Sequence, residues 1–385
     1  MYDVVIVGQG LSGLLSAIWA REEGKRVAVV SNGLGKILQS TGVFDLIPGT
    51  DADFDSFSTF HGLNTNFKTH SINGIEKFKT LVRRLDCDYL GKVTHPVEIA
   101  TASGHVKTTA LYPDTIRPVP MKGRAIVVGF KELMDFQPSY LKGNLQKYRP
   151  DLKINAISVS LGKNTLRTMT QIDVARTLEQ KDVRQHVINQ IKNTLIEKNM
   201  ANADFMIFPS CLGIDLWKDV KNHFQNELKT IVSEAPGLPP NAAAIRLYEK
   251  LRKEAVKLGV RFYADTKVVG CTVSNNLINS LEVQNVNAKN QIQASHYVIA
   301  TGGVLGGGLV VTTNGYKESA LALPVNEFGE YKDMPANAIA VGGSQGIRVT
   351  NNGIVGGIYS IVSSYFSILS IRDFVGEEQI VCTVN

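Results

Sequence analysis

Three glycines near the start of the chain have the spacing of a phosphate-binding turn. Residues 8–13 read G-Q-G-L-S-G, which matches the pattern G-x-G-x-x-G. In this pattern the first glycine allows a tight turn, the second lets a pyrophosphate approach the backbone, and the third lets a helix pack closely on a strand. The pattern predicts a dinucleotide or flavin site. The residues predicted to bind the cofactor here are Gly8, Gly10, Leu11, Ser12 and Gly13.

The flanking sequence has the elements that such a turn needs. Residues 2–7 form an apolar run rich in valine and isoleucine, as in a strand buried on both faces of a parallel sheet. Residues 14–19 keep helical spacing, Gly24 is placed to end the helix, and residues 27–30 form a second apolar run. The helix N-terminus would offer free N–H groups and a positive dipole end to a phosphate. The alternative interpretation is a glycine-rich turn without a ligand.

The residue after the second predicted strand is unusual for a dinucleotide site. The chain has Ser31 where an Asp or Glu commonly binds the adenosine ribose. A serine cannot form the two-oxygen contact of a carboxylate. Three hypotheses follow: FAD bound in another way, a shorter flavin such as FMN, or NADP with Ser31 and Lys36 near its 2′-phosphate. NADP is the least favoured, because no arginine closely follows Ser31.

Other segments of small residues are expected to meet the glycine turn. Residues 296–303 (HYVIATGG) and 337–343 (NAIAVGG) predict two further strands of one sheet, each ending in small residues that permit close backbone contact. A helix over about residues 356–371 would direct its positive dipole end at a flavin. The residues predicted from these strands are Ala300, Thr301, Gly302, Gly303, Gly342 and Gly343.

The loop after the second strand supplies further candidates. Residues 38–49 read LQSTGVFDLIPG, and Ser40, Thr41 and Gly42 are predicted to lie over the cofactor. An ordinary polar connection explains this loop equally well.

Composition and charge exclude several classes of protein. The 385 residues are 44% hydrophobic and 20% charged, with a net charge of +6. Because the lysines and arginines are scattered, nucleic-acid binding is not predicted. The four cysteines lie far apart and have no zinc or iron–sulfur spacing, so no metal site is predicted. Histidines 61, 70, 95 and 105 lie in polar surroundings and are predicted to be on the surface.

The chain opens directly on a predicted strand, so no leader segment is expected. Residues 349–371 carry no charge, but their asparagines, serines and glycines make a buried helix a better prediction than a membrane span.

The pattern of elements predicts two domains. Strands and helices alternate between about residues 125 and 230, including a strand at 125–129 and a long helix at 172–198. A helix at 241–258 precedes three short strands at 260–264, 267–274 and 278–286, which are predicted to form a β-meander. The predicted fold class is α/β, a Rossmann-like FAD/NAD(P)-binding fold with a central parallel sheet, a β-meander crossover and an inserted α/β second domain. Residues 1–50 and 238–385 are predicted to form the flavin or dinucleotide domain, and residues 51–237 the inserted domain.

Several motifs together resemble a family of flavoproteins, the B component of the anaerobic glycerol-3-phosphate dehydrogenase complex. They run in order through most of the chain: GLSGLLSAI, STGVFDLIPG, VVGFKELMDFQ, FPSCLGI, GLPPNAAAIRL, ATGGVLGGGLV with NGYKE, and NAIAVGG. A serine or threonine in the place of Ser31 also fits this family. The segment 344–358 departs from it, because the family has more glycine there and a cysteine.

The resemblance implies a flavin subunit that depends on FMN, with FAD as the alternative. It also implies a larger flavin subunit that carries the substrate site and oxidises sn-glycerol 3-phosphate to dihydroxyacetone phosphate. A third, iron–sulfur subunit would attach the complex to the inner face of the cell membrane and pass electrons towards quinone. The chain itself would then be cytoplasmic.

No general base can be named from the sequence. Arg246, in the IRL part of a matching motif, is a candidate for binding a phosphate of the cofactor or substrate, with an ion-paired surface arginine as the alternative. Two other functions stay open. One is a stand-alone FAD oxidoreductase that acts on another hydroxy acid or an amine, and the other is a non-catalytic scaffold that retains the flavin fold.

Overall fold

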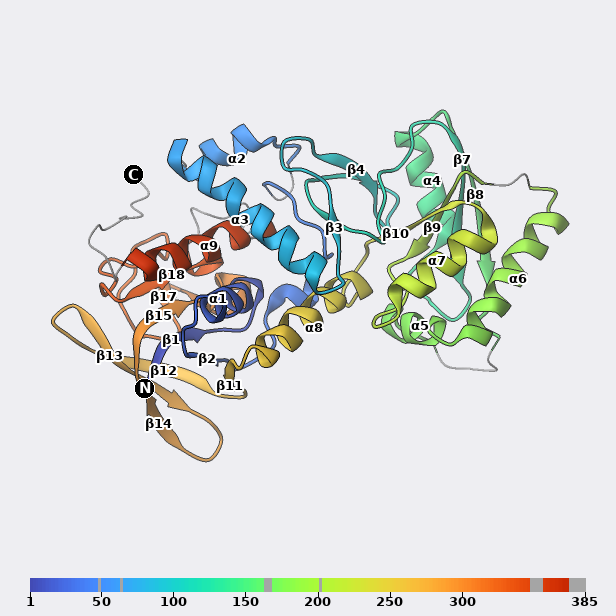
Figure 1. Ribbon diagram of the computed structural model, residues 1–385. Coiled ribbons are helices and arrows are strands. Elements are labelled where there is room, and N and C mark those ends of the chain that lie inside the picture. Colours follow the sequence, from blue (N-terminus) through green and yellow to red (C-terminus); the bar gives the residue numbers. More distant parts are fainter. Residues whose placement is uncertain (48–49, 63–64, 163–167, 201–202, 347–355, 374–385) are drawn as a thin grey trace. The chain divides into compact units, whose positions relative to one another are not determined.

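The computed structural model describes residues 1–47, 50–62, 65–162, 168–200, 203–346 and 356–373 (Figure 1). Contacts between residues divide the chain into two compact units, and each is described by itself. The first unit contains Met1–Ile37, Phe44–Asp86 and Tyr248–Asn385. The second unit contains Leu38–Val43 and Cys87–Leu247. Cys382 and most of the divergent segment 344–358 lie outside the described residues.

A five-stranded parallel sheet forms the centre of the first unit. Its order is β11 (Arg261–Tyr263), β2 (Val27–Val30), β1 (Tyr2–Val7), β15 (Ala294–Ile299) and β18 (Ala338–Ala340). All four residues of β2 and the last four of β1 are buried, because helices cover one face of the sheet and a β-meander covers the other. The predicted central parallel sheet is confirmed.

Three helices pack together on one face of this sheet. They are α1 (Leu11–Glu22), α3 (Thr65–Arg84) and α9 (Gly357–Asp373), and Figure 1 shows α3 running alongside α9. Small residues allow α1 and α9 to approach closely, since the Ser364 hydroxyl donates to the Ser12 carbonyl at 3.1 Å. Gly74 of α3 lies against the Tyr365 ring of α9.

The β-meander is present but uses different strands from those predicted. It consists of β12 (Lys267–Ser274), β13 (Leu277–Gln284) and β14 (Lys289–Ile292), all antiparallel. The predicted first strand at 260–264 is instead β11, which pairs in parallel with β2 and extends the main sheet. Asn275 and Asn276 adopt positive φ angles of 50° and 58°, as the two-residue turn between β12 and β13 requires.

The second unit has its own parallel sheet. Its order is β10 (Ile231–Ala235), β9 (Phe205–Pro209), β7 (Gly123–Phe130) and β8 (Leu152–Val159). The helices of this unit are α4 (Pro138–Tyr148), α5 (Gln171–Leu178), α6 (Lys181–Glu197) and α7 (Trp217–Leu228). Two short hairpins, β3 (Tyr89–Leu90) with β6 (Tyr112–Pro113) and β4 (Val97–Ala100) with β5 (Val106–Thr109), complete it. The predicted second α/β domain is confirmed as a fold.

The single long helix predicted at 172–198 is wrong, because it is broken between α5 and α6. Glu179, just after α5, turns its carboxylate to the backbone N–H groups of Ile214 and Leu216, at 2.6 and 2.9 Å. Arg184 of α6 donates to the carbonyl of Leu178, at the end of α5. Contacts from distant residues therefore satisfy the backbone groups exposed at the break.

The two units differ from the predicted domain boundaries at three places. Residues 44–86 belong to the first unit, because α2 (Phe54–Phe60) and α3 pack on α9. Residues 38–43 belong to the second unit. The predicted helix at 241–258 is confirmed as α8 (Ala242–Lys257), and the division into units falls within it, after Leu247.

Within the residues described, no helix is both long and apolar enough to cross a membrane.

Arg246 is buried in the second unit and is fully engaged there. Its guanidinium donates to both carboxylate oxygens of Glu234 at 2.8 Å, to the Gly213 carbonyl at 2.7 Å and to the Thr115 hydroxyl at 3.0 Å. The side chains of Arg246 and Glu234 are 2% and 0% exposed. Glu234 also accepts the N–H of Leu212. These contacts make Arg246 a structural clamp on the loop after β9, and they leave little capacity for an anion.

Removing one partner of this pair should destabilise the chain strongly. Arg246→Met would leave the Glu234 carboxylate buried without its cation. The expected loss in the free energy of unfolding is about 3–5 kcal/mol, measured by chemical denaturation of the full chain. Arg124→Met is the matched control, because Arg124 pairs with Asp204 at 3.6 Å on the surface, with side chains 51% and 61% exposed. It should cost less than about 1 kcal/mol. Equal losses in the two variants would contradict the clamp.

His61 is buried, so its predicted place on the surface is wrong. It follows α2 and is 7% exposed. Its ring stacks on Tyr359 of α9 at a centroid distance of 4.2 Å and meets the edge of Phe57 at 4.6 Å. Burial lowers the pKa of His61 to about 4. The polar local sequence gives no sign of this, since the burial comes from packing of α2 on α9.

The depressed pKa of His61 predicts a loss of stability in mild acid. The unfolded chain binds a proton at His61 near pH 6.5, and the folded chain only near pH 4. Stability is therefore complete above about pH 6.5 and falls as the pH drops towards 4. Between pH 7 and pH 5 the wild type should lose about 2 kcal/mol more than His61→Phe, measured by denaturation at both pH values. His95→Phe, at an exposed histidine, should follow the wild type; matching curves for all three proteins would refute the prediction.

Candidate functional site

The first and third glycines of the turn lie where no other residue fits. Gly8 follows β1 with a φ of 107°, and a Cβ there would overlap the carbonyl oxygen of Ala300. A Cβ on Gly13 would overlap the carbonyl oxygen of Gly8 and lie 3.4 Å from the Ala300 Cβ. The end of β1, the start of α1 and the end of β15 are therefore in direct backbone contact.

The small residues after β18 join the same cluster. A Cβ on Gly343 would lie 2.6 Å from the Gly303 nitrogen, and a Cβ on Gly342 would lie 2.5 Å from the Ser12 hydroxyl. These glycines open the short helix η3 (Gly342–Gln345). Ser344 in η3 accepts the Gly302 N–H at 3.1 Å and the Thr301 hydroxyl at 3.3 Å. The structure thus brings the three predicted segments together at the carboxyl ends of adjacent strands.

The second glycine of the turn differs from the other two, because it faces open space. A Cβ on Gly10 would have no other atom within 4 Å. Gly10 is also the N-cap of α1 and makes no side-chain cap hydrogen bond. Since the first N–H groups of a helix have no partners within the helix, this end of α1 can receive an anion. The geometry fits a phosphate group held by the backbone.

Ser31 lies at the end of β2, where a dinucleotide-binding protein commonly has a carboxylate. Its backbone N–H donates to the Tyr263 carbonyl, and its carbonyl accepts the Thr266 N–H, both at 3.1 Å. The Ser31 hydroxyl is buried and has no hydrogen-bond partner. A buried hydroxyl without a partner at this place fits a cofactor that supplies one.

The predicted loop residues Ser40, Thr41 and Gly42 lie in the second unit. The Ser40 carbonyl accepts from the Asn241 amide at 2.7 Å, and the Gly42 carbonyl accepts from the Tyr89 hydroxyl at 2.7 Å. These contacts fasten the loop to residues of its own unit. Its predicted role over the cofactor stays a prediction.

Gln9 is a residue of this site that the motif analysis passed over. It lies between Gly8 and Gly10, is 3% exposed and donates to the Gly33 carbonyl at 2.7 Å. A long polar side chain between two glycines of the turn is the sequence signal that marked it.

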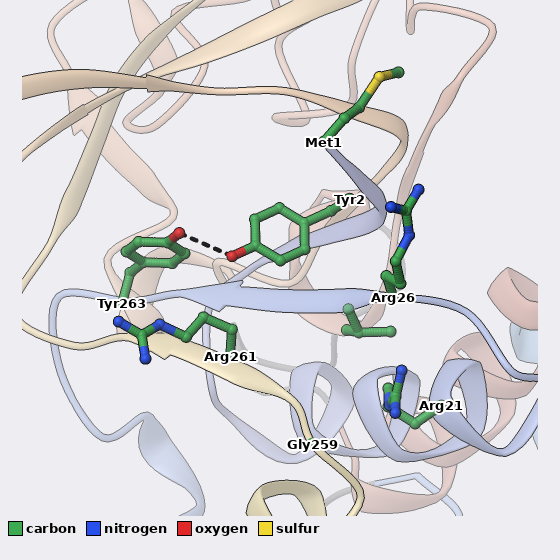
Figure 2. Close-up of a pocket in the computed structure, with 8 residues that line it drawn as sticks. Met1, Tyr2, Arg21, Arg26, Gly259, Arg261 and Tyr263 are labelled. Carbon is green, nitrogen blue, oxygen red and sulfur yellow. Dashed lines mark hydrogen bonds between the residues drawn. The ribbon is translucent and has the colours of Figure 1, made fainter.

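A pocket of about 540 Å³ lies at the other end of the main sheet, where the strands begin (Figure 2). Three arginines line it, but each has a local partner. Arg21 donates to the carbonyls of Leu258 and Lys25, Arg26 pairs with Asp3, and Arg261 lies over the Tyr263 ring. Figure 2 shows that the three guanidinium groups do not converge on one point, so they do not form one anion site.

The described part of the chain contains no group of three or more His, Cys, Asp and Glu residues placed to hold a metal ion.

Comparison with curated proteins finds relatives that share one name. Three matches are named as the B component of anaerobic glycerol-3-phosphate dehydrogenase. The protein from Glaesserella parasuis is 28% identical over 334 residues, or 80% of this chain and 76% of that protein. The one from Mannheimia succiniciproducens is 26% identical, with 80% and 76% covered. The one from Yersinia pestis is 25% identical, with 84% and 80% covered.

Solved structures with a similar fold include two oxidoreductases. The 3-ketosteroid delta1-dehydrogenase of Sterolibacterium denitrificans is 14% identical with a TM-score of 0.37, covering 78% of this chain and 48% of that one. The L-amino acid deaminase of Proteus vulgaris is 14% identical with a TM-score of 0.30, covering 80% and 48%.

The family comparison agrees with the site. The family model described as FAD binding domain matches residues 3–358, which include the glycine turn and the strands that meet it. A flavin is the cofactor that this family and this cradle share. The chain therefore belongs to the FAD binding domain family.

Proposed function

We propose that this chain is the flavin-carrying B component of an anaerobic glycerol-3-phosphate dehydrogenase complex. Support comes from relatives of that name that align with about four-fifths of the chain. The single observation that carries the flavin-binding part is the open face of Gly10 at the N-terminus of α1, beside the buried hydroxyl of Ser31. Sn-glycerol 3-phosphate is the proposed substrate of the complex and dihydroxyacetone phosphate its product.

Each part of the site has a proposed role. The α1 N-terminus would bind the cofactor phosphate, and Ser31 would hydrogen-bond the cofactor or a water beside it. The backbones at Ala300–Gly303 and Gly342–Gly343 would let the flavin approach closely, and the N-terminal end of α9 would favour negative charge on it. When bound, a flavin supplies exchange between two-electron and one-electron transfer.

The rest of the complex belongs to other chains. We propose a larger flavin subunit that carries the substrate site, and an iron–sulfur subunit that attaches the complex to the inner face of the membrane and passes electrons towards quinone. The cysteines that the structure describes, Cys87, Cys211 and Cys271, are free and separate, so the proposal places any iron–sulfur cluster on another chain.

Filling the open face of Gly10 should remove flavin without unfolding the chain. In Gly10→Ala the added methyl group meets no protein atom and the φ of −71° suits alanine, so the melting temperature should not fall. The methyl group would occupy the place of the phosphate and weaken flavin binding by about tenfold or more. Flavin fluorescence titration measures this. Gly143→Ala, also in open space but in α4, is the control; a Gly10→Ala protein with full flavin affinity would argue against this cradle.

The activity is tested with the assembled complex. The chain is co-expressed with the two partner subunits, and reduction of a quinone analogue is followed after addition of sn-glycerol 3-phosphate. The expected result is substrate-dependent turnover that falls in Gly10→Ala. Turnover by the isolated chain on another hydroxy acid or an amine would favour a stand-alone oxidoreductase. Full turnover of a complex in which this chain holds no flavin would favour a scaffold role.

A further inference from the structure

The side chain of Gln9 ties the glycine turn to two other parts of the first unit. Its Nε2 donates to the Gly33 carbonyl at 2.7 Å, in the loop that follows β2. Its Oε1 accepts from the Tyr248 hydroxyl and from Arg252 Nε, both at 3.4 Å and both on α8. Because Gln9 is 3% exposed, these contacts leave its side chain fixed in one place.

The loop after β2 lies against the turn itself. Gly35 has a φ of 77°, and a Cβ on it would lie 2.7 Å from the Gly10 Cα and 2.9 Å from the Gly10 nitrogen. The open face of Gly10 is a separate side of the turn, because a Cβ there meets nothing within 4 Å. One side of the turn is thus open to a phosphate, and residues 33–35 cover another.

The covered side is the one that a dinucleotide needs. A bound dinucleotide places its pyrophosphate at the N-terminus of the first helix and its adenosine ribose at the end of the second strand. Gly10 and Ser31 mark these two positions here. The Gln9–Gly33 hydrogen bond and the Gly35–Gly10 contact join them, so an adenosine arm would have to displace the loop. A flavin that ends in one phosphate needs only the open face of Gly10.

We propose that Gln9 determines which flavin this chain accepts. By holding residues 33–35 against the turn, it selects the mononucleotide, FMN, over the dinucleotide, FAD. This inference rests on the proposed flavin function. Gln9 is a positioning residue that acts through the loop, and the absence of a carboxylate at Ser31 works in the same direction, since the adenosine ribose loses a partner.

The test compares two flavins on the same apoprotein. The full-length chain is freed of cofactor and titrated separately with FMN and FAD, and an equimolar mixture is then offered and the bound flavin identified by mass spectrometry. The wild type should bind FMN about tenfold or more tightly than FAD. Gln9→Met keeps the volume of the side chain but cannot donate to Gly33, and it should reduce this ratio by about tenfold. Gln137→Ala, at an exposed glutamine, is the control and should keep the wild-type ratio.

A second measurement needs no cofactor. Hydrogen exchange of the peptide that contains residues 31–37 should be faster in the Gln9→Met apoprotein than in the wild type, because the loop has lost its anchor. Unchanged exchange would show that Gln9 does not hold the loop.

The outcomes separate the two proposals. If wild-type chain binds neither flavin, alone or with its partner subunits, the flavin function fails and the inference fails with it. If the wild type prefers FAD, or if Gln9→Met keeps the wild-type ratio, the flavin function stands and the role of Gln9 is refuted.

Discussion

The first unit depends on a contact between backbones that only glycine permits. Gly8 lies against the carbonyl of Ala300, and Gly13 lies against the carbonyl of Gly8, with no room for a Cβ at either. This contact brings β1, α1 and β15 to one place, and Gly343 adds the end of β18 by its approach to Gly303. Protein interiors are close-packed, so a single methyl group here would push the strand ends apart. The geometry of the whole candidate site follows from this packing.

Against this background the open face of Gly10 has a different meaning. Its neighbours Gly8 and Gly13 are glycines because the protein fills the space around them, whereas Gly10 is a glycine beside empty space. A residue kept small where the protein does not require it points to a ligand. Gln9 and Gly35 then limit that ligand, since they cover the side of the turn next to Ser31.

The second unit is stabilised by charge as well as by its apolar core. Arg246 and Glu234 are buried together, and their hydrogen bonds organise the loop after β9. The motifs FPSCLGI and IRL, which contributed to the family resemblance, are the two sides of this arrangement. Their pattern in the sequence therefore reports a structural need, and Arg246 does not require a phosphate ligand to explain it.

The sequence alone determined those features that depend on local pattern. The strand–turn–helix–strand unit, the parallel strand at 337–343 and the alternating elements of the second unit follow from periodicity and glycine spacing, because neighbouring residues set them. Tertiary structure decided the rest. His61 is buried by α2 packing on α9, the predicted long helix breaks where Glu179 caps a distant loop, and β11 joins the main sheet instead of the meander. Each of these outcomes depends on residues far apart in the chain, as does the Gln9–Gly33 bond, and such partners leave no mark in a local stretch of sequence.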